Sequence, residues 1–346
     1  TAIRYEDPAN GIDAVFNYGL FSFNTPNFIF RFSLGETDYQ LGATDYAHFA
    51  AEYAFDGRSV WQQTLNLSKE EKAELIRLLQ ENYRPENRVY RYNFFYDNCA
   101  TRPRDKIEES IIGKVIYPSE PQDGSRSFRD IVHQYCKGHP WARFGIDLCI
   151  GSEADRPITQ RQMMFAPFYL MDAFAGAQIA NDSIQRPLVS DKALIVDAVS
   201  DEEEGGWMPT PLQCSLLLFI LTAAATIYSL RKRTGLWGVD LVLFGTAGIV
   251  GCVLAFLALF SEHPAVSSNF LLLVFHPGQF LFLPYIIYCV RKGKKCWYLT
   301  LNLIVLTLFI AFFPLIPQRF DFAVVPLALC LLIRSASNLI LTSKKK

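Results

Sequence analysis

The sequence predicts an α+β head followed by an all-α domain that spans a membrane. The chain has 346 residues, and this length indicates about two domains. Residues 1 to about 205 carry charges throughout, whereas residues 212–342 are almost wholly apolar, with their charges in short clusters. Apolar runs of roughly 20 residues are long enough to cross a bilayer. The formal net charge of −1 argues against nucleic acid as the main partner.

The sequence of the first part of the head predicts alternating strands and helices. Strands are expected at 1–7 and 12–18, because Asn10-Gly11 between them supplies the positive φ that a tight turn requires. Ser68 and Glu71 have the spacing of a capping box, so a helix should run from there to Tyr83, before Pro85. The remaining expected elements are a helix from residue 44 or 45 to residue 55, strands at 37–41, 59–67 and 89–95, and a helix through residue 109.

The second part of the head is less regular. Residues 113–126 are rich in Pro, Ser and Gly and predict a loop, and residues 127–135 and 161–179 predict helices. Residues 144–157 are interpreted as irregular structure, a wall of the site. The acidic run at 201–206 predicts a solvated linker. The expected domains are therefore a head over 1–200, a linker over 201–211 and a transmembrane domain over 212–346.

Five apolar runs predict five spans, at about 212–230, 238–260, 269–290, 297–316 and 320–341. The fifth run contains Asp321, Pro326 and Arg334 and is the weakest. Basic clusters follow the first, third and fifth runs, and such clusters remain on the cytoplasmic side. These clusters are Arg231–Arg233, Arg291–Lys295 and Lys344–Lys346. The head, with the loops 262–264 and 317–319, is therefore expected outside the cytoplasm, with the C-terminus inside.

The most reactive stretch expected in the chain runs from Tyr92 to Asp105. Asn98 is a good N-cap residue, which would place Cys99 at the positive end of the following helix. That position favours the thiolate form, and Arg102 and Arg104 add positive charge nearby. The alternative is that Cys99 is a small buried apolar residue. The polar and cationic surroundings favour a nucleophile.

A cysteine nucleophile requires a base and a group that orients the base. Of the histidines, His48 is the candidate base in the head, whereas His133 and His139 are interpreted as surface or packing residues. His263, next to Glu262, would either contact a lipid headgroup or lie in a solvated loop, and His276 would line a cavity in the third span. Asn17 or Asp13 would orient a histidine supplied by the first strand.

The cysteines favour no metal site. The sequence has no CxxC or Cys/His spacing typical of zinc. Cys136 and Cys149 would be either paired, if the head is periplasmic, or both free.

The chain resembles the Lnb-type bacterial lipoprotein N-acyltransferases, in their periplasmic domain over residues 1–110, more loosely over 127–180, and in their membrane domain. The resemblance covers nearly the whole chain, and the Cys99 motif is its most specific part. The matching stretches are Val15–Gly19, Phe23–Phe28, Leu65–Leu67, Arg84–Arg88, Tyr92–Asp105, Phe144–Gly151, Glu153–Thr159 and Ser261–Pro264.

This resemblance implies a permuted papain-like head, similar to the lecithin–retinol acyltransferases, followed by a five-helix transmembrane domain. It implies that Cys99 is the nucleophile and that Tyr92, seven residues earlier, stabilises the oxyanion with the Asn98 corner beside it. The family histidine belongs to a Gly-His pair just before the residues that match Thr1–Arg4. This chain starts at Thr1 without Met or a signal-like segment, so we expect that its natural N-terminus lies upstream and that the chain as given is nearly inactive.

The implied reaction moves an acyl chain from a membrane phospholipid, through a thioester on Cys99, to the N-terminal amine of a diacylglyceryl-cysteine lipoprotein. No soluble cofactor is required, and Arg102, Glu262 and His263 are candidate substrate-binding residues. Two alternatives remain open at this point: a membrane-tethered cysteine hydrolase of cell-wall peptides and a non-catalytic sensor or scaffold of the envelope. The sequence leaves open the phospholipid, the acyl position, the base and the oligomeric state.

Overall fold

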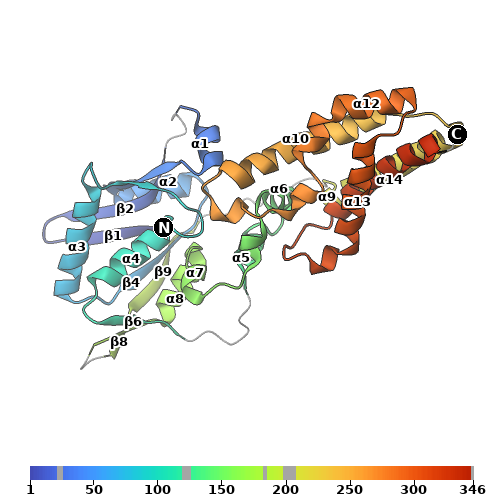
Figure 1. Ribbon diagram of the computed structural model, residues 1–346. Coiled ribbons are helices and arrows are strands. Elements are labelled where there is room, and N and C mark those ends of the chain that lie inside the picture. The colour runs from blue at the N-terminus through green and yellow to red at the C-terminus, as the bar shows by residue number, and fades with distance from the viewer. Residues whose placement is uncertain (22–25, 119–125, 182–184, 198–207, 344–346) are drawn as a thin grey trace. The chain divides into compact units, whose positions relative to one another are not determined.

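The computed structural model describes residues 1–21, 26–118, 126–181, 185–197 and 208–343, and the chain forms two compact units (Figure 1). The first unit is Thr1–Ile131 with Pro157–Gly205, and the second is Val132–Arg156 with Gly206–Lys346. Residues 132–156, expected in the head, thus group with the apolar helices. Four expectations lie wholly or partly outside the described residues: the stretch 23–25, the loop at 113–126, the linker up to residue 207 and the basic cluster 344–346.

The first unit is built on a four-stranded antiparallel sheet of order β1-β2-β3-β5. The expected first hairpin is present, with Gly11 at φ 64° in its turn. Ala2 pairs with Asn17 and Asp7 with Ile12, which sets the register of the hairpin. The strands are β1 (Ala2–Asp7), β2 (Ile12–Leu20), β3 (Asp38–Asp45) and β5 (Val89–Arg91).

Two smaller sheets complete the strands of this unit. The expected strand at 59–67 is β4 (Val60–Leu65), and it pairs with β9 (Val189–Val196), which the sequence did not predict. The expected loop at 113–126 contains β6 (Lys114–Ile116), which pairs with β7 (Gln178–Ala180), and β7 pairs with β8 (Gln185–Pro187). Short strands of three residues lack the length for a recognisable alternation of polar and apolar side chains.

Helices pack on this sheet. The capping box before α3 is formed, because the Ser68 hydroxyl accepts the Glu71 amide and the Glu71 carboxylate accepts the Ser68 amide. The helix expected at 161–179 is divided, because Pro167 starts a new helix and cannot continue an existing one. The helices are α1 (Phe28–Leu34), not predicted, α2 (Tyr46–Phe55), α3 (Lys69–Tyr83), α4 (Thr101–Ser110), α5 (Phe128–Tyr135), α7 (Gln160–Met163) and α8 (Pro167–Gly176).

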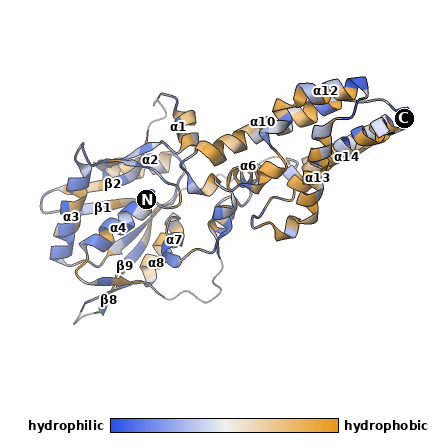
Figure 2. Cartoon of the chain, viewed as in Figure 1, coloured by the Kyte–Doolittle hydropathy of each residue, from blue (hydrophilic) through white to orange (hydrophobic). Residues whose placement is uncertain are grey.

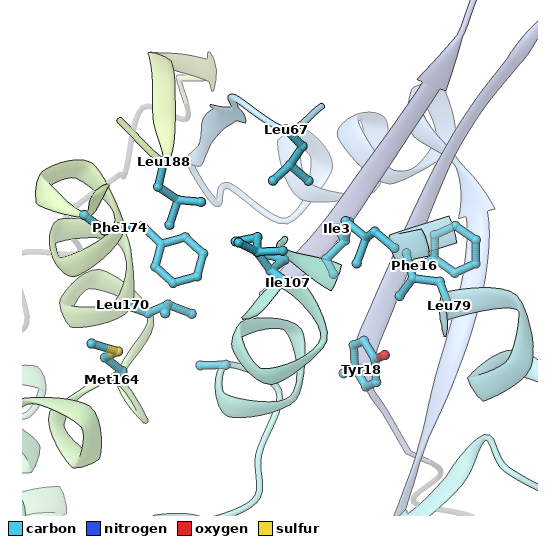
Figure 3. Packing of buried hydrophobic residues seen from close by; sticks show 14 of the residues in the cluster. Ile3, Phe16, Tyr18, Leu67, Leu79, Ile107, Met164, Leu170, Phe174 and Leu188 are labelled. Atoms are coloured by element: carbon cyan, nitrogen blue, oxygen red, sulfur yellow. The ribbon is translucent and has the colours of Figure 1, made fainter. Parts of the chain in front are cut away.

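One face of the sheet and the helices α3, α4 and α8 enclose the hydrophobic core of the first unit (Figure 3). Alternate residues of β1 and β2 point into it, among them Ile3, Phe16 and Tyr18. Ile107 of α4 and Phe174 of α8 meet them from the helical side. Because α4 lies within this core, the turn that precedes it, with Cys99, is held in a fixed position.

Among its described residues, the second unit has three helices that are long and apolar enough to cross a membrane. The apolar colouring extends over them in Figure 2. The count rises to four if α12 and α13, which meet at 110°, form one broken span. The first, second and fifth expected spans are continuous helices: α9 (Pro211–Lys232), α10 (Trp237–Phe260) and α14 (Val324–Ser343).

The third and fourth expected spans differ from the prediction. The third is broken into η3 (Phe270–Leu273), α11 (Pro277–Leu281) and α12 (Leu283–Lys292), because Pro277 and Pro284 have no amide hydrogen to continue a helix. The fourth is α13 (Trp297–Ala311), which is 15 residues long and is followed by η4 (Phe313–Leu315). Pro326 does not kink α14, since it lies in the first turn, where the amide has no partner within the helix.

Close backbone packing holds the broken third span against α10. A Cβ atom on Gly248 would lie 2.4 Å from the Phe280 amide nitrogen, and one on Gly251 would lie 2.4 Å from that of His276. Small residues permit this approach between helices in membranes. The buried carboxylate of Asp240 in α10 accepts two hydrogen bonds from Arg334 in α14, at 2.7 and 3.0 Å, which explains how an arginine is tolerated in the fifth span.

The segment 144–157, expected to be irregular, forms α6 (Pro140–Cys149) and η1 (Ser152–Asp155). Pro140 starts the helix, as proline commonly does at the first helical position. This segment bonds to the loop that follows α10, where the Gly151 amide donates to Ala265 O and the Asn269 side chain donates to Leu148 O, both at 2.7 Å. It also bonds to the loop that follows α13, where the Gln318 side chain donates to Ile150 O at 3.2 Å. It therefore belongs to one end of the helical unit.

Candidate active site around Cys99

Asn98 holds the turn that presents Cys99. The Asn98 side-chain oxygen accepts the amides of Ala100 and Thr101 at 2.8 and 3.0 Å, and its carbonyl accepts the Arg102 amide at 3.2 Å. These bonds are those that a capping side chain makes, but the helix α4 begins at Thr101 after Ala100, so Cys99 lies in the turn just before the helix and not at its first position. The Asn98 amide group donates to the carbonyls of Phe94 and Phe165, at 2.8 and 3.0 Å. Buried Asn98 thus orients the thiol by bonding on both sides of the turn.

Strand β2 forms one wall beside the thiol. A Cβ atom on Gly19 would lie 3.6 Å from Cβ of Cys99 and 3.3 Å from the side-chain oxygen of Asn17. That oxygen accepts the Gly19 amide at 2.9 Å. Cys99 is half-buried rather than enclosed. The Cβ atom of Cys99 therefore lies beside strand β2 of the first hairpin, next to the side chain of Asn17.

Tyrosines surround the thiol. Tyr92 packs on Tyr39 with ring centroids 4.1 Å apart, and both belong to the fringe of the core with Cys99. Burial raises the pKa of Tyr92, and the adjacent Cys99 raises it further because two anions would repel. The pKa values of Tyr39 and Tyr90 rise for the same two reasons, burial first. The sequence analysis identified Tyr92 as a candidate site residue but missed Tyr39. The alternation of Tyr39 with Leu41 along β3 was the signal that could have placed Tyr39 on the same face of the sheet.

The Tyr92 hydroxyl, like that of Tyr39, differs from the hydroxyls of Tyr90 and Tyr18 in its bonding. Tyr90 donates to the carbonyl of Tyr18 at 2.6 Å, and the Tyr18 hydroxyl donates to Asn82 at 2.9 Å. Within the described residues, the Tyr92 hydroxyl makes no hydrogen bond. A protonated and unengaged phenol beside the thiol has the chemistry of an oxyanion donor.

Arg102 is engaged within the head. Its guanidinium donates to both oxygens of Asp97 at 2.7 Å and lies 3.7 Å above the ring of Tyr90. Because Asp97 neutralises the charge of Arg102, this pair does not provide a free cation beside the turn. Asp13, the other charged candidate, bonds to Arg4 at 2.7 and 2.8 Å, and this partner lowers its pKa. Neither the Arg102–Asp97 pair nor the Arg4–Asp13 pair includes a histidine.

The comparisons with known proteins agree over both units. Residues 1–123 match the family model described as the Lnb N-terminal periplasmic domain, and residues 202–346 match the Lnb transmembrane domain. The chain belongs to the Lnb family. Searches among curated proteins and among solved structures returned no match. The Lnb match to the first unit includes Cys99, Tyr92 and Asn17, and the match to the second includes Glu262 and His263.

The described residues of this Lnb chain bring no histidine into hydrogen-bond contact with Cys99. His48 is exposed on α2. His133, interpreted as a surface or packing residue, is half-buried and bonds through Nε2 to both oxygens of buried Asp147, at 2.8 and 3.0 Å. His139 precedes the first turn of α6 and accepts the Arg143 amide through its carbonyl at 3.0 Å.

Glu262 and His263 belong to the Lnb transmembrane domain, in the loop after α10, where the His263 amide donates to Ser261 Oγ at 3.3 Å. Cys136 and Cys149 are both free, and burial raises the pKa of Cys149. In the part of the chain that the structure describes, no three His, Cys, Asp or Glu side chains gather to hold a metal.

A polar cluster lies inside the Lnb transmembrane domain. His276 lines a cavity of about 240 Å³, as the sequence predicted, with leucines and a valine around it. The Tyr298 hydroxyl lies 3.3 Å from His276 Nδ1, and Asn302 Oδ1 lies 3.4 Å from His276 Nε2. The cavity is mostly apolar and suits a hydrocarbon chain with a polar end.

Proposed function

We propose that this Lnb-family chain is a cysteine-dependent lipoprotein N-acyltransferase. It moves a fatty acyl chain from a membrane phospholipid, through a Cys99 thioester, to the N-terminal amine of a diacylglyceryl-cysteine lipoprotein. The observation that carries this proposal is Cys99 in the turn just before α4, beside the unengaged hydroxyl of Tyr92, in a chain with an Lnb transmembrane domain. The helix N-terminus preceded by an antiparallel sheet also supports a permuted papain-like head.

The reaction has two steps. The thiolate of Cys99 attacks the ester carbonyl, the ester C–O bond breaks, and the lysophospholipid leaves with a proton from the general acid. The lipoprotein amine then attacks the thioester, the C–S bond breaks, and the amine proton passes to the base as the thiolate returns. Each step builds an oxyanion, which the Tyr92 hydroxyl stabilises as a donor. Tyr92 can donate because burial raises its pKa and keeps it protonated.

The base is proposed to come from the position directly before Thr1, where the Lnb resemblance places a histidine. The register of β1 and β2 supports this position, because Ala2 pairs with Asn17 and each earlier residue pairs with a later one. The position before Thr1 would then stand opposite Gly19, which borders Cys99. Asn17 is the better orienting residue, since Asp13 is already bonded to Arg4.

Both substrates are anchored in the bilayer, which suits a catalytic head joined to apolar helices. The cavity beside His276 is proposed to hold part of an acyl chain, and Glu262 and His263 to contact a lipid headgroup. The loops with Arg233 and Arg291 line one cavity together with the end of α14, so the basic residues gather at one end of the unit. By the positive-inside rule, we place that end and the C-terminus in the cytoplasm and the head in the periplasm, at the inner membrane.

The decisive experiment uses the full chain preceded by a Gly-His pair, mixed with a phospholipid carrying a labelled acyl chain. We expect label on the protein that hydroxylamine removes, and transfer to a diacylglyceryl lipopeptide. Cys99→Ala should lose both signals, whereas Cys149→Ala should keep them. Chains preceded by Gly-Ala, or starting at Thr1, should form thioester far more slowly.

Other outcomes would point to other functions. Labelled fatty acid released into water without transfer to the lipopeptide would indicate a hydrolase. Label that persists in Cys99→Ala, or that never appears, would remove the acyltransferase proposal and favour a binding role.

A further inference from the structure

A second cavity lies at the basic end of the transmembrane domain. Its volume is about 370 Å³, within the range of small-ligand sites. It is bounded by the loop between α9 and α10, the end of α12 and the last turns of α14. Its polar lining includes Arg233, Arg291, Arg334, Ser337 and Asn338. No step of the proposed acyl transfer uses this cavity.

The wall of this cavity is positively charged. Arg334 and Asp240 both line it, and their charges cancel in a buried pair with bonds of 2.7 and 3.0 Å. Arg233 and Arg291 have no ion pair within the described residues. The Arg291 guanidinium lies 5.2 Å from the ring centre of Trp237, which directs it along the wall of the cavity. The described wall thus carries two uncompensated positive charges.

Two side chains at the cavity lack hydrogen-bond partners although they are buried. Ser337 is 1% exposed and Asn338 is 6% exposed, yet Ser337 Oγ and Asn338 Oδ1 bond to no described group. A buried polar atom without a partner costs about 1–3 kcal/mol. Asn338 Oδ1 can only accept a hydrogen bond, whereas the serine hydroxyl can also donate one. The pair therefore calls for a ligand that offers both a donor and an acceptor.

We propose that this cavity binds the phosphate-bearing headgroup of a phospholipid from the leaflet at the basic end. The phosphate accepts from Arg233, Arg291 and the Ser337 hydroxyl, and an ammonium or hydroxyl of the headgroup donates to Asn338. The α9–α10 loop and the helix ends lie where headgroups lie in a bilayer, and arginine pairs well with phosphate. This lipid is distinct from the acyl donor and binds whether or not Cys99 is reactive.

The test measures binding of phosphatidylethanolamine, in mixed micelles, to the purified full chain in detergent. We expect Arg291→Gln and Asn338→Leu each to weaken binding about tenfold, the size of one lost charge-assisted hydrogen bond. The matched control is Lys292→Gln, which removes the neighbouring charge outside the cavity lining and should change Kd less than about twofold. Melting curves without lipid report whether each variant is folded.

The outcomes separate the sources of phosphate and the two sites. Equal weakening by Lys292→Gln and Arg291→Gln would overturn the proposal in favour of general charge attraction. Inorganic phosphate that competes with the lipid at equal concentration would overturn a lipid site and indicate a free-phosphate site. Cys99→Ala should bind the lipid unchanged, so failure of the acyl-transfer test leaves this proposal standing. Loss of binding in Cys99→Ala would assign the lipid to the active site instead.

Discussion

Gly19 stands directly against Cys99: a Cβ atom placed on the glycine would lie 3.6 Å from Cβ of the cysteine. The same atom would lie 3.3 Å from the side-chain oxygen of Asn17, closer than most Cβ contacts. The absence of a side chain on β2 therefore leaves room at the thiol. Three parts of the candidate site therefore meet at Gly19: Cys99, the Asn17 amide and the strand that pairs with β2.

A larger side chain at Gly19 should block this space. We expect Gly19→Val to lower kcat/KM for acyl transfer by about 100-fold, because displacement of reacting groups by about 1 Å has effects of that size. Gly19→Ala should lower kcat/KM much less, since the alanine methyl group requires Asn17 to shift by only a few tenths of an ångström. Transfer assays with the histidine-extended chain measure both. Equal rates for Gly19→Val and the parent would contradict the inference that free space at Gly19 is required for the reaction at Cys99.

Tyr92→Phe should reduce the rate without unfolding the head. Loss of one oxyanion donor lowers kcat by about 100- to 1,000-fold, and the Tyr92 hydroxyl has no described bond to lose. Tyr90→Phe is the matched control, because its hydroxyl donates to Tyr18 O at 2.6 Å. It should lower stability by about 1 kcal/mol and leave kcat nearly unchanged. The reverse pattern, measured by single-turnover assays and thermal melts, would reject Tyr92 as the donor.

Asn98→Ala should loosen the turn and slow alkylation of Cys99. The change removes four hydrogen bonds and leaves buried backbone groups unpaired, at a cost of about 3 kcal/mol. The control is Asn93→Ala in the same loop, whose oxygen accepts only the Phe95 and Tyr96 amides at 3.2 Å. That variant should lose about 1 kcal/mol and keep the iodoacetamide rate. Urea melts and the alkylation rate at Cys99 give the two readouts.

Glu71 should make the stability of the head depend on pH. Burial alone would raise its pKa, but hydrogen bonds from Arg186 and from the Ser68 and Ile112 amides outweigh this effect and lower it. A lowered folded-state pKa stabilises the protein above the unfolded value, about 4.3, and this contribution is lost as the pH falls through the folded value. Glu71→Gln should therefore cost about 2 kcal/mol at pH 7 and much less at pH 3.

Glu74 on the same helix is the control for this prediction. Its pair with Arg77 is exposed on both sides, so Glu74→Gln should leave the stability nearly unchanged. Denaturant melts of both variants between pH 3 and pH 7 measure the difference. A pH-independent cost for Glu71→Gln would contradict the charged pair with Arg186.

Local chemistry made several features predictable from the residues alone. The capping box at Ser68, the turn at Asn10-Gly11 and the capping bonds of Asn98 each depend on side chains within a few positions of the backbone groups that they bond. The long apolar runs of α9, α10 and α14 are equally local, because length and composition decide whether a helix can cross a bilayer. The turn that carries Cys99 was predicted for the same reason.

Other features depend on contacts between residues far apart in the chain. Three such contacts are Glu71–Arg186, Asp240–Arg334 and Gly19–Cys99, and no periodic pattern in the sequence indicates them. No such pattern assigns residues 132–156 to the helical unit either. The prediction of five continuous spans was also wrong at the third span, where proline breaks the helix and glycines of α10 allow its backbone to pack closely. Sequence thus determined most of the elements and the turn that carries Cys99, through short-range bonding and hydrophobicity. Tertiary packing alone decided which tyrosines, charges and cavities stand beside them.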